Sequence, residues 1–391
     1  MIPFHHSAGL GMRRVASLAA SLLLMVSVNG CGGGADGSGG AIANFGVLNL
    51  SACLLAYNSA SGGAGGGGGS GSYGFYPENS GGPGGDAGSG NGGALFNAGS
   101  AFLVNNTFVS NSGTGGNGGI GGSGAPPMSS SDFTGNGGHG GLGGSGYGAI
   151  VDSNGLCFLT NCTIAFNQSS QGTGGMGGPA GPWIYPPSYP PRLGAPGGNG
   201  ADGDPGAGLK TIGAHLLNTV LSSNAPANCV GVVADDGYNL SSDATPAFSG
   251  AGSMSNTDPK LRPLADNGGP TLTMALVPGS PAINAGASIG APTTDQRGVA
   301  RPKGGGVDIG AFEFEFEIPQ IARFRLQSPR QFWLQSCGLP DHTYTLQSST
   351  NLTYWSDLTN LCVGADGFCT FVDSSSNGCE RCFYRLKPTQ P

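Results

Sequence analysis

The chain has 391 residues, of which 78 are glycine and 27 are proline, while Asp, Glu, Lys and Arg together make up only 9%. Glycine and proline are the poorest helix formers, and charged side chains normally solvate helix surfaces. This composition therefore excludes an ordinary helical or doubly wound enzyme. The net charge of −7 and the few Lys and Arg residues argue against nucleic acid as a partner. No run of roughly 20 apolar residues follows the N-terminal segment, so no transmembrane span is expected in the mature chain.

The N-terminal segment resembles a secretory signal. A basic stretch at 12–14 precedes an apolar or small run at 15–28, and a cleavage-like site ends at Gly30. We therefore expect residues 1–30 to be a signal peptide and the protein to be secreted or held at the bacterial cell surface. Cys31 follows the cleavage site, so lipid attachment there is a second interpretation. A third is that the segment is a truncated first coil of the repeat described next.

Four segments of similar sequence recur along the chain. Each begins with Gly, continues with short runs of alternating apolar residues and ends with Asn, which fits strands of about three to five residues better than a helix. Units that bury their apolar faces only by stacking on one another form solenoids. The sequence therefore predicts an all-β solenoid. The four segments are 39–58, 92–111, 146–167 and 206–224.

The last residue of each repeat is an asparagine in the same phase: Asn58, Asn111, Asn167 and Asn224. In stacked coils these side chains would lie about 4.8 Å apart, so their amides could hydrogen-bond along the stack. Asn also tolerates the left-handed backbone conformation that a corner needs. We therefore expect a structural ladder of asparagines rather than a set of ligand contacts.

Gly-rich inserts separate the repeats, at roughly 62–91, 115–145 and 174–205. They contain tandem Gly-Gly-x triplets and leave each repeat just after its Asn corner. Two interpretations stay open. The inserts are disordered, since glycine is costly to order, or they pack as extended chains with three residues per turn. The stretch 197–202 matches the start of a calcium-binding nonapeptide, but a single partial copy predicts no metal site.

The stretch from Asn256 to Phe312 is rich in turns and contains a distinctive set of motif residues. They are Asp258, Asn267, Gly268, Gly269, Pro281, Asp295, Arg297, Asp308 and Gly310. Together with the repeats, this stretch resembles the choice-of-anchor Q domain of bacterial surface proteins, and the repeats also resemble those of polymorphic outer-membrane proteins. The resemblance implies a right-handed parallel β-helix of the pectate-lyase-like type over 31–255. It implies no particular activity.

The turn-rich segment has a physical role in such a fold. A solenoid needs a terminal unit that covers its last apolar coil and leaves no strand edge open. We therefore expect residues 256–317 to form a cap. Arg297 and Asp308 are the natural partners of an ion pair or of hydrogen bonds inside it.

Composition changes near Ile318, and residues 318–391 are expected to form a separate domain. Alternating apolar runs around Phe324, Phe332 and Tyr344, divided by Gly, Pro or Asn, predict a small β-sandwich. The sequence motifs of this domain resemble a module found at the end of bacterial secreted proteins. That resemblance implies a role in retention, sorting or binding.

Ten cysteines are present, and five of them fall in the C-terminal domain. In an exported chain we expect these five to form disulfides, whose pairing the sequence does not decide; a zinc site is the alternative. Cys53 and Cys162 share a phase two coils apart, beyond disulfide reach, and are expected to be buried as small apolar residues. The five are Cys337, Cys362, Cys369, Cys379 and Cys382.

Catalytic groups are sparse in the repeats. A lyase needs a base beside the uronate that it deprotonates, and a glycoside hydrolase needs paired carboxylates close together. No nucleophile and base stand out as a pair, so the sequence argues against catalysis. The candidates are Asp152, Lys210, Asp235, Asp236, His139 and His215.

Two functions are therefore open. The sequence favours a non-catalytic secreted or cell-surface scaffold, without metal or cofactor, that binds an extracellular polysaccharide or a surface protein. Trp183, Tyr185 and Tyr189 in the third insert could stack on sugars or could simply hold that insert in place. The alternative is a polysaccharide-acting lyase or hydrolase of the pectate-lyase-like β-helix type.

Overall fold

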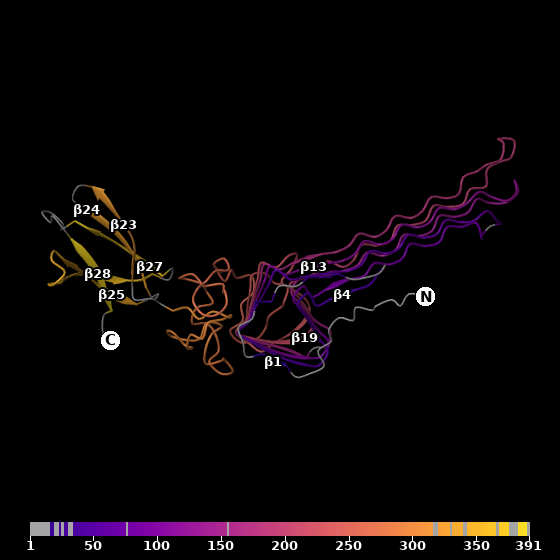
Figure 1. The fold of residues 1–391 in the computed structure, drawn as a ribbon. Coiled ribbons are helices and arrows are strands. Elements are labelled where there is room, and N and C mark those ends of the chain that lie inside the picture. The colour runs from indigo at the N-terminus through magenta and orange to yellow at the C-terminus, as the bar shows by residue number, and fades with distance from the viewer. Residues whose placement is uncertain are drawn as a thin grey trace.

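The computed structural model describes residues 16–18, 23–24, 27–29, 34–75, 77–154, 156–315, 320–328, 331–338, 342–364, 367–374 and 382–388. Every regular element in these ranges is a β-strand (Figure 1), so none of the described residues forms a helix that could cross a membrane. The all-β class expected from the sequence is confirmed. The strands before residue 256 pair in parallel, whereas those after residue 319 pair antiparallel.

Four parallel sheets nearly close around a common core. Sheet A contains β1 (Ala16–Leu18), β5 (Ile42–Asn44), β6 (Val47–Ser51), β10 (Leu95–Asn97), β11 (Ser100–Val104), β15 (Ile150–Asp152), β16 (Cys157–Thr160), β19 (Leu209–Leu217) and β21 (Cys229–Asp235). Sheet B contains β2 (Leu23–Leu24), β7 (Leu54–Ala56), β12 (Thr107–Val109), β17 (Thr163–Ala165), β20 (Val220–Ser222) and β22 (Leu240–Ser241). Sheet C contains β3 (Ser27–Asn29), β8 (Ser59–Ser61), β13 (Ser112–Thr114) and β18 (Gln168–Ser170), and sheet D contains β4 (Gly37–Ser38), β9 (Gly90–Asn91) and β14 (Gly146–Tyr147).

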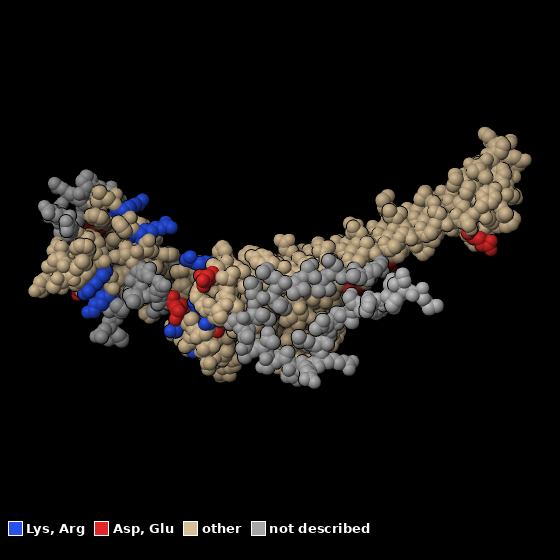
Figure 2. Space-filling view, in the orientation of Figure 1, with Lys and Arg blue, Asp and Glu red and all other residues tan. Residues whose placement is uncertain are grey.

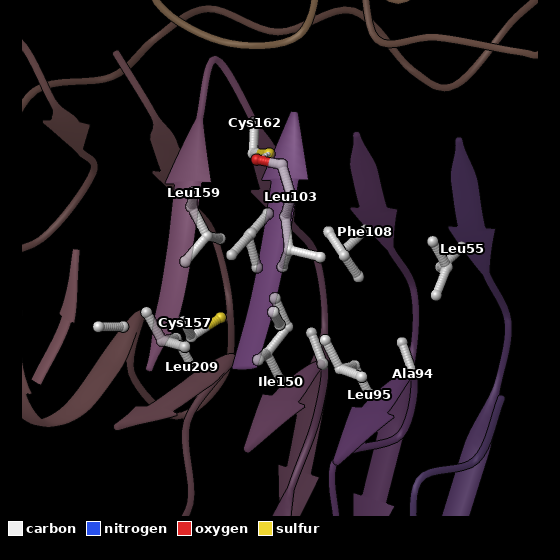
Figure 3. Close-up of a cluster of buried hydrophobic side chains, with 14 of the residues drawn as sticks. Leu55, Ala94, Leu95, Leu103, Phe108, Ile150, Cys157, Leu159, Cys162 and Leu209 are labelled. Atoms are coloured by element: carbon white, nitrogen blue, oxygen red, sulfur yellow. Dashed lines mark hydrogen bonds between the residues drawn. The ribbon is translucent and has the colours of Figure 1, made fainter. Parts of the chain in front are cut away.

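Equivalent residues of successive repeats pair in register and form columns through the core. Leu50 pairs with Leu103, and Leu103 pairs with Leu159. Leu159 in turn pairs with Leu216. Figure 3 shows Leu103 and Leu159 side by side on neighbouring strands. Each such side chain is at most 3% exposed, and burial of a leucine contributes roughly 1.5–3 kcal/mol. The alternating apolar residues of the repeats therefore hold the stack together.

The corners of the repeats differ from the expectation in one respect. The residue that takes the left-handed conformation is the one before each ladder asparagine, with φ of 59° at Tyr57 and 55° at Phe166. The prediction that the ladder asparagines themselves use this conformation is therefore wrong. They are fully engaged in hydrogen bonds through their side chains. A second corner does use asparagine at positive φ, at Asn105, Asn161 and Asn218.

The described parts of the segment that resembles a signal peptide lie in the same register as the repeats. β1 pairs with β6, β2 with β7 and β3 with β8, all in parallel. This arrangement agrees with the interpretation of the segment as a first coil. Export of the chain and removal of residues 1–30 stay predictions. Cys31 lies outside the described residues.

The three Gly-rich inserts form six extended limbs that run side by side as a long arm (Figure 1). Three outgoing limbs, 62–71, 115–125 and 172–181, continue from the strands of sheet C. The three returning limbs are 81–90, 135–145 and 194–205. The first two lead into β9 and β14 of sheet D, and the third leads into β19 of sheet A. Of the two interpretations of the inserts, the packed one therefore agrees with the structure.

Backbone hydrogen bonds with a period of three residues join the limbs. The N–H groups of Gly65, Gly68 and Gly71 donate to carbonyl oxygens of the second outgoing limb over 2.8–2.9 Å, and that of Gly62 donates to Thr114 just before this limb. The returning limbs bond to the outgoing limbs in the same rhythm, as from Gly85 N–H to the Gly66 oxygen at 2.7 Å. This is the geometry of extended chains with three residues per turn. The Gly-Gly-x triplets therefore build a lattice of main-chain hydrogen bonds.

The x residues of the triplets complete this lattice through their side chains. Oδ1 of Asn136 accepts a hydrogen bond from the Ala195 N–H at 2.8 Å, and Nδ1 of His139 accepts one from the Gly198 N–H at 3.0 Å. Asp202, in the calcium-like stretch, accepts one from the Gly174 N–H at 2.8 Å. These side chains therefore accept hydrogen bonds from backbone N–H groups of the neighbouring limbs.

Residues 256–315, called the clasp below, lie along the side of the stacked strands. Met274 packs against Leu54, Val109 and Ala165, which face outward from three successive strands of sheet B. The clasp also hydrogen-bonds to the second corner, from Asn105 Nδ2 to the oxygen of Thr294 at 2.6 Å. This segment therefore covers the outer face of sheet B, and the cap over the last coil stays a prediction.

The charges of the clasp pair differently from the expectation. Arg297 bonds to Asp295, with Nη2 2.8 Å from Oδ2, and its guanidinium lies 3.7 Å from the centre of the Phe312 ring. Arg301 bonds to Glu313 at 2.7 Å. Asp308 accepts hydrogen bonds from the N–H groups of residues 284 and 314. Arg297 and Asp308 therefore do not pair with each other, because the nearer Asp295 binds the arginine, but both residues form hydrogen bonds inside the clasp.

The remaining motif residues of the clasp shape its turns. Asp258 accepts a bond from the Lys260 N–H, and the amide of Asn267 donates to the Thr273 oxygen at 2.8 Å. Gly268, Gly269 and Gly310 all have positive φ. A Cβ on Gly269 would lie 2.7 Å from the Cα of Arg297. Pro281 precedes the fully buried Ala282, which packs on Val220 and Leu240 of the stack. The hydrogen bonds and positive φ values of these residues set the backbone path of the clasp.

The C-terminal part consists of two antiparallel three-stranded sheets. Leu334, Tyr344, Leu346, Leu361 and Leu386, drawn from both sheets, form their shared core. The expected strand content of residues 318–391 is therefore confirmed. One sheet contains β23 (Gln320–Ser328), β24 (Gln331–Cys337) and β27 (Phe368–Asp373), and the other contains β26 (Ser356–Cys362), β25 (Thr343–Ser349) and β28 (Phe383–Pro388).

No disulfide joins any two cysteines in the part of the chain that the structure describes. Cys369 Sγ lies 2.8 Å from the hydroxyl of Ser336 on the neighbouring strand, and Cys379 lies outside the described residues. Cys53 and Cys162 are buried, as expected. Burial raises the pKa of Cys162 to about 12, which makes this thiol unreactive.

Candidate functional site

The four asparagines that end the repeats form a continuous hydrogen-bonded ladder. The side-chain amide of Asn58 donates to Asn111, that of Asn111 to Asn167, and that of Asn167 to Asn224, over 2.8–2.9 Å. Asn224 continues the ladder to Asn228 at 2.9 Å. All five side chains are buried, at 7% exposure or less. Buried amides with satisfied partners serve the fold, and none of these is accessible to a ligand.

A second ladder, which the sequence analysis missed, crosses the other side of the core. The amide of Asn44 donates to Asn97, and that of Asn97 donates to Asp152, over 2.7 and 3.0 Å. The hydroxyl of Thr211 donates to the other oxygen of Asp152 at 3.0 Å. Asp152 is 1% exposed. This catalytic candidate is therefore a buried rung of a ladder.

Lys210 lies on β19, which pairs with the strand of Asp152, but its side chain points to the other face of the sheet. It lies between Leu209 and Thr211, which are both buried, and its ammonium lies 4.1 Å from the centre of the Tyr147 ring. Side chains of successive residues on a strand point to opposite faces. Lys210 therefore stabilises an aromatic neighbour outside the core, and it cannot act together with Asp152.

Asp235 is a structural hub of the loops that end the stack. One of its carboxylate oxygens accepts bonds from Asn239 and Ser253, and the other accepts bonds from the N–H groups of residues 249 and 250. Burial opposes ionisation, but the hydrogen bonds from Gly250 and Asn239 hold the pKa of Asp235 below its ordinary value. A carboxylate with every oxygen occupied is a poor base.

Asp236 pairs with His215 on the surface. Oδ2 of Asp236 lies 3.1 Å from Nδ1 of His215, and the two side chains are 48% and 41% exposed. The imidazole stacks on Phe158 at 4.9 Å, and Phe158 stacks on Phe102 at 5.1 Å. The sequence did not reveal this pair, because the two residues lie 21 positions apart. The column neighbours of His215 are Phe158 and Ala234, and neither of them supplies a nucleophile to the pair.

The catalytic candidates do not converge. Asp152 lies inside the core, Lys210 and His139 lie on different outer surfaces, and Asp235 is bound by its own loop. Among the residues that the structure describes, no three His, Cys, Asp or Glu side chains are placed to share a metal ion. These positions therefore supply neither paired carboxylates nor an activated base.

The aromatic residues of the third insert meet at the far end of the arm. Trp183 and Tyr185 lie edge to face, with ring centres 5.5 Å apart, and Tyr185 and Tyr189 lie 6.4 Å apart in the same way. Tyr189 is 48% exposed. The indole N–H of Trp183 is buried and has no hydrogen-bond partner among the described residues. The three candidates for glycan contacts thus form one cluster.

The other two inserts add aromatic residues to the same end. Desolvation and then the neighbouring Tyr73 raise the pKa of Tyr185, so the first and third inserts touch there. Phe133 of the second insert lies under the guanidinium of Arg192, 5.5 Å away. We call residues 72–75, 77–80, 126–134 and 182–193 the tip. Its exposed large apolar side chains are Tyr73, Phe75, Met128, Phe133, Ile184, Tyr189 and Leu193.

Sequence reasoning found the tip in one insert and missed it in two. Tyr73, Phe75 and Phe133 lie near the midpoints of their inserts. Three hairpins of similar length that leave one edge together bring their midpoints together. The spacing of the aromatic residues in the sequence therefore indicates the tip. This indication depends on the inserts being ordered hairpins.

Comparisons with known proteins leave the family open. No family model matches the chain, and no curated protein or solved structure matches it either.

Proposed function

We propose that this chain is a non-catalytic, exported scaffold of the parallel β-helix type whose arm presents a glycan-binding tip. The four repeats, stacked in register with a core column and two side-chain ladders, support the β-helix interpretation. The motif residues of the clasp support kinship with the choice-of-anchor Q surface proteins. The N-terminal sequence supports secretion or display at the cell surface.

The arm is the observation that carries this proposal. Its six limbs are joined by main-chain hydrogen bonds along their whole length, so bending the arm means breaking many bonds together. Figure 1 shows it reaching far from the stacked strands, with the tip at its end. A long rigid element that ends in exposed aromatic side chains is suited to contact with a distant surface.

The chemistry of the tip favours a sugar ligand. Tyr and Trp side chains offer a broad apolar face together with a polar group, which suits the apolar faces and hydroxyls of pyranose rings. Tyr73, Tyr185 and Tyr189 carry hydroxyls, and the indole N–H of Trp183 is available to an oxygen if the ring shifts slightly. Lys and Arg are nearly absent from the visible face of the arm (Figure 2), so a neutral glycan fits better than an anionic one.

The proposal is tested by binding and turnover on a polysaccharide array, with reducing ends and unsaturated uronates as product signals. The full chain is compared with the variant Y185A/Y189A and with Y354A, which removes a 79% exposed tyrosine from the C-terminal sheets. We expect binding without product, lost in the tip variant and kept in Y354A. Product formation, or equal binding by all three proteins, would overturn the proposal.

A further inference from the structure

The sheet formed by β23, β24 and β27 has an outer face of unusual composition. Across its strands Arg323 pairs with Gln335 and Arg325 pairs with Trp333. Trp333 pairs in turn with Val372, and Gln335 with Thr370. Leu334 lies between Trp333 and Gln335 and is buried at 3% exposure. The residues that flank Leu334 therefore point outward together with their partners.

Two arginines of this face have no acidic partner among the residues that the structure describes. Arg323 and Arg325 are exposed, and no carboxylate of the described residues forms an ion pair with either of them. Asp373, the acidic residue at the end of β27, is buried and accepts a bond from the Tyr384 hydroxyl at 2.7 Å. The positive charge of this face is therefore not neutralised by the described part of the sheet.

The arginines stand beside an aromatic platform. The guanidinium of Arg325 lies 4.8 Å from the centre of the Trp333 ring. A hollow of about 470 Å³ runs along β23 and is lined by Arg323, Arg325 and Trp333 together with Ile321 and Phe324. In Figure 2 the Lys and Arg side chains of the visible face gather on the C-terminal sheets and the clasp. The charge is local, because the whole chain carries −7.

We propose that this face, called the Arg–Trp face below, binds a carboxylated polysaccharide. A guanidinium presents a planar fork of donors that matches a carboxylate, and an indole ring covers the apolar face of a pyranose. Neighbouring strands lie about 4.8 Å apart and alternate residues on a strand about 6.8 Å apart. The grid of Arg323, Arg325 and Trp333 therefore matches one or two adjoining uronate units.

The composition of the face favours a polysaccharide over other anions. A phospholipid headgroup is bound most often by clustered lysines or by a pocket, and single-stranded nucleic acid by several aromatic residues along a strongly basic groove. The Arg–Trp face has one tryptophan and two arginines on a three-stranded sheet. This site lies in a different part of the chain from the tip, so it does not depend on the proposed function.

The test measures binding of the full chain to oligogalacturonate by calorimetry, with neutral galactan as the matched ligand. The variant R323Q/R325Q removes both charges from the face. The control R385Q/K387Q removes two charges from β28, on the other sheet, where Arg385 stacks on Trp355 at 4.1 Å. Thermal unfolding of both variants shows whether each is folded. The conservative variant R323K/R325K keeps the charge and removes the fork.

We expect oligogalacturonate to bind and galactan not to bind. R323Q/R325Q should bind at least about tenfold more weakly, R385Q/K387Q within about twofold of the original chain, and R323K/R325K in between. Binding should weaken as salt rises, because exposed charges are screened. Equal losses in the two glutamine variants would overturn the inference, as would binding of anionic vesicles or single-stranded DNA alone. Y185A/Y189A should leave oligogalacturonate binding unchanged. A result against glycan binding by the tip is therefore distinguishable from a result against the Arg–Trp face.

Discussion

Gly119 and Gly66 approach each other so closely that a Cβ on Gly119 would lie 2.0 Å from the carbonyl oxygen of Gly66. The contact is one-sided, because a Cβ on Gly66 would meet nothing within 4 Å. The same asymmetry recurs along the limbs, as at Gly141, whose Cβ would lie 2.0 Å from the Gly85 oxygen. In each triplet, glycine is thus required where the backbone faces another limb.

The first prediction uses the two partners of this contact. Gly119→Ala should destabilise the arm by about 2 kcal/mol or more, because neighbouring backbone must move to admit the methyl group. Gly66→Ala should be neutral or slightly stabilising, since it only restricts the unfolded chain. Limited proteolysis of the arm measures both. Equal effects of the two alanines would contradict the packing of the limbs.

The second prediction concerns the asparagine ladder. The amide of Asn167 donates to Asn224, to the Phe108 oxygen and to the Ala165 oxygen, and its own oxygen accepts from Asn111. Asn167→Ala should cost about 3 kcal/mol of unfolding free energy, because it leaves several buried groups without partners. Urea unfolding provides the measurement. The exposed Asn360→Ala should stay within about 0.5 kcal/mol of the original chain, and a similar loss there would argue against the ladder.

The third prediction concerns the buried carboxyl of Asp308 in the clasp. Burial, and next the neighbouring Glu313, raise its pKa from 3.8 to about 7. The folded state therefore favours the protonated form, and this stabilisation is complete below about pH 4 and lost as the pH rises through about 7. The melting temperature should accordingly be lower at pH 8 than at pH 5.

Asp308→Asn isolates this contribution. The amide is neutral at every pH, so the variant should lose much of the change in melting temperature between pH 5 and pH 8. Asp235 and Asp243 act in the opposite direction, since hydrogen bonds lower their pKa values despite burial. Their stabilisation is lost only as the pH falls below about 4. An identical pH dependence in the original chain and the variant would contradict the role of Asp308.

The fourth prediction separates the scaffold from an enzyme. Asp152 is held between Asn97 and Thr211 inside the core, and both partners donate hydrogen bonds to its carboxylate oxygens. An amide accepts only through its oxygen, so Asp152→Asn keeps the bond from Asn97 and places its NH2 group against the Thr211 hydroxyl. The substitution should therefore destabilise the chain by about 1 to 2 kcal/mol, the cost of one buried polar group without a partner. It should also leave polysaccharide binding unchanged. An activity that this substitution abolishes would favour the lyase or hydrolase interpretation.

The repeats could be predicted because their signals are local and recur. Comparison of the repeats with one another shows that Asn58 and the alternating leucines recur at equivalent positions, and that the inserts follow each repeat at the same point. Because the repeats stack in register, equivalent residues form columns. The ladder of Asn44, Asn97 and Asp152 was less visible, because its last members are aspartate and threonine instead of asparagine. A search for identical residues at equivalent positions does not find ladder positions where a different side chain forms the same hydrogen bond.

Long-range placement could not be predicted. The clasp lies along sheet B because Met274 packs on an apolar surface there and the side chain of Asn105 donates a hydrogen bond to Thr294. The sheet B residues and Asn105 are far from the clasp in the sequence. Likewise, Arg297 bonds to Asp295 two residues away instead of the more distant Asp308. The regular structure of the arm depends on hydrogen bonds among all six limbs, so the sequence of a single insert does not predict it.

The account rests most directly on the arm, since both the reach of the tip and the meeting of its aromatic residues depend on ordered limbs. Hydrogen–deuterium exchange of the full chain, followed peptide by peptide, measures this order. The amides that donate to neighbouring limbs should be protected nearly as well as the strands of sheet A. They include those of Gly65, Gly85, Gly119, Gly141 and Gly175, and exchange is read from the peptides that contain them. Complete exchange of all three inserts within seconds, while sheet A stays protected, would show that the inserts are not packed and would contradict the account.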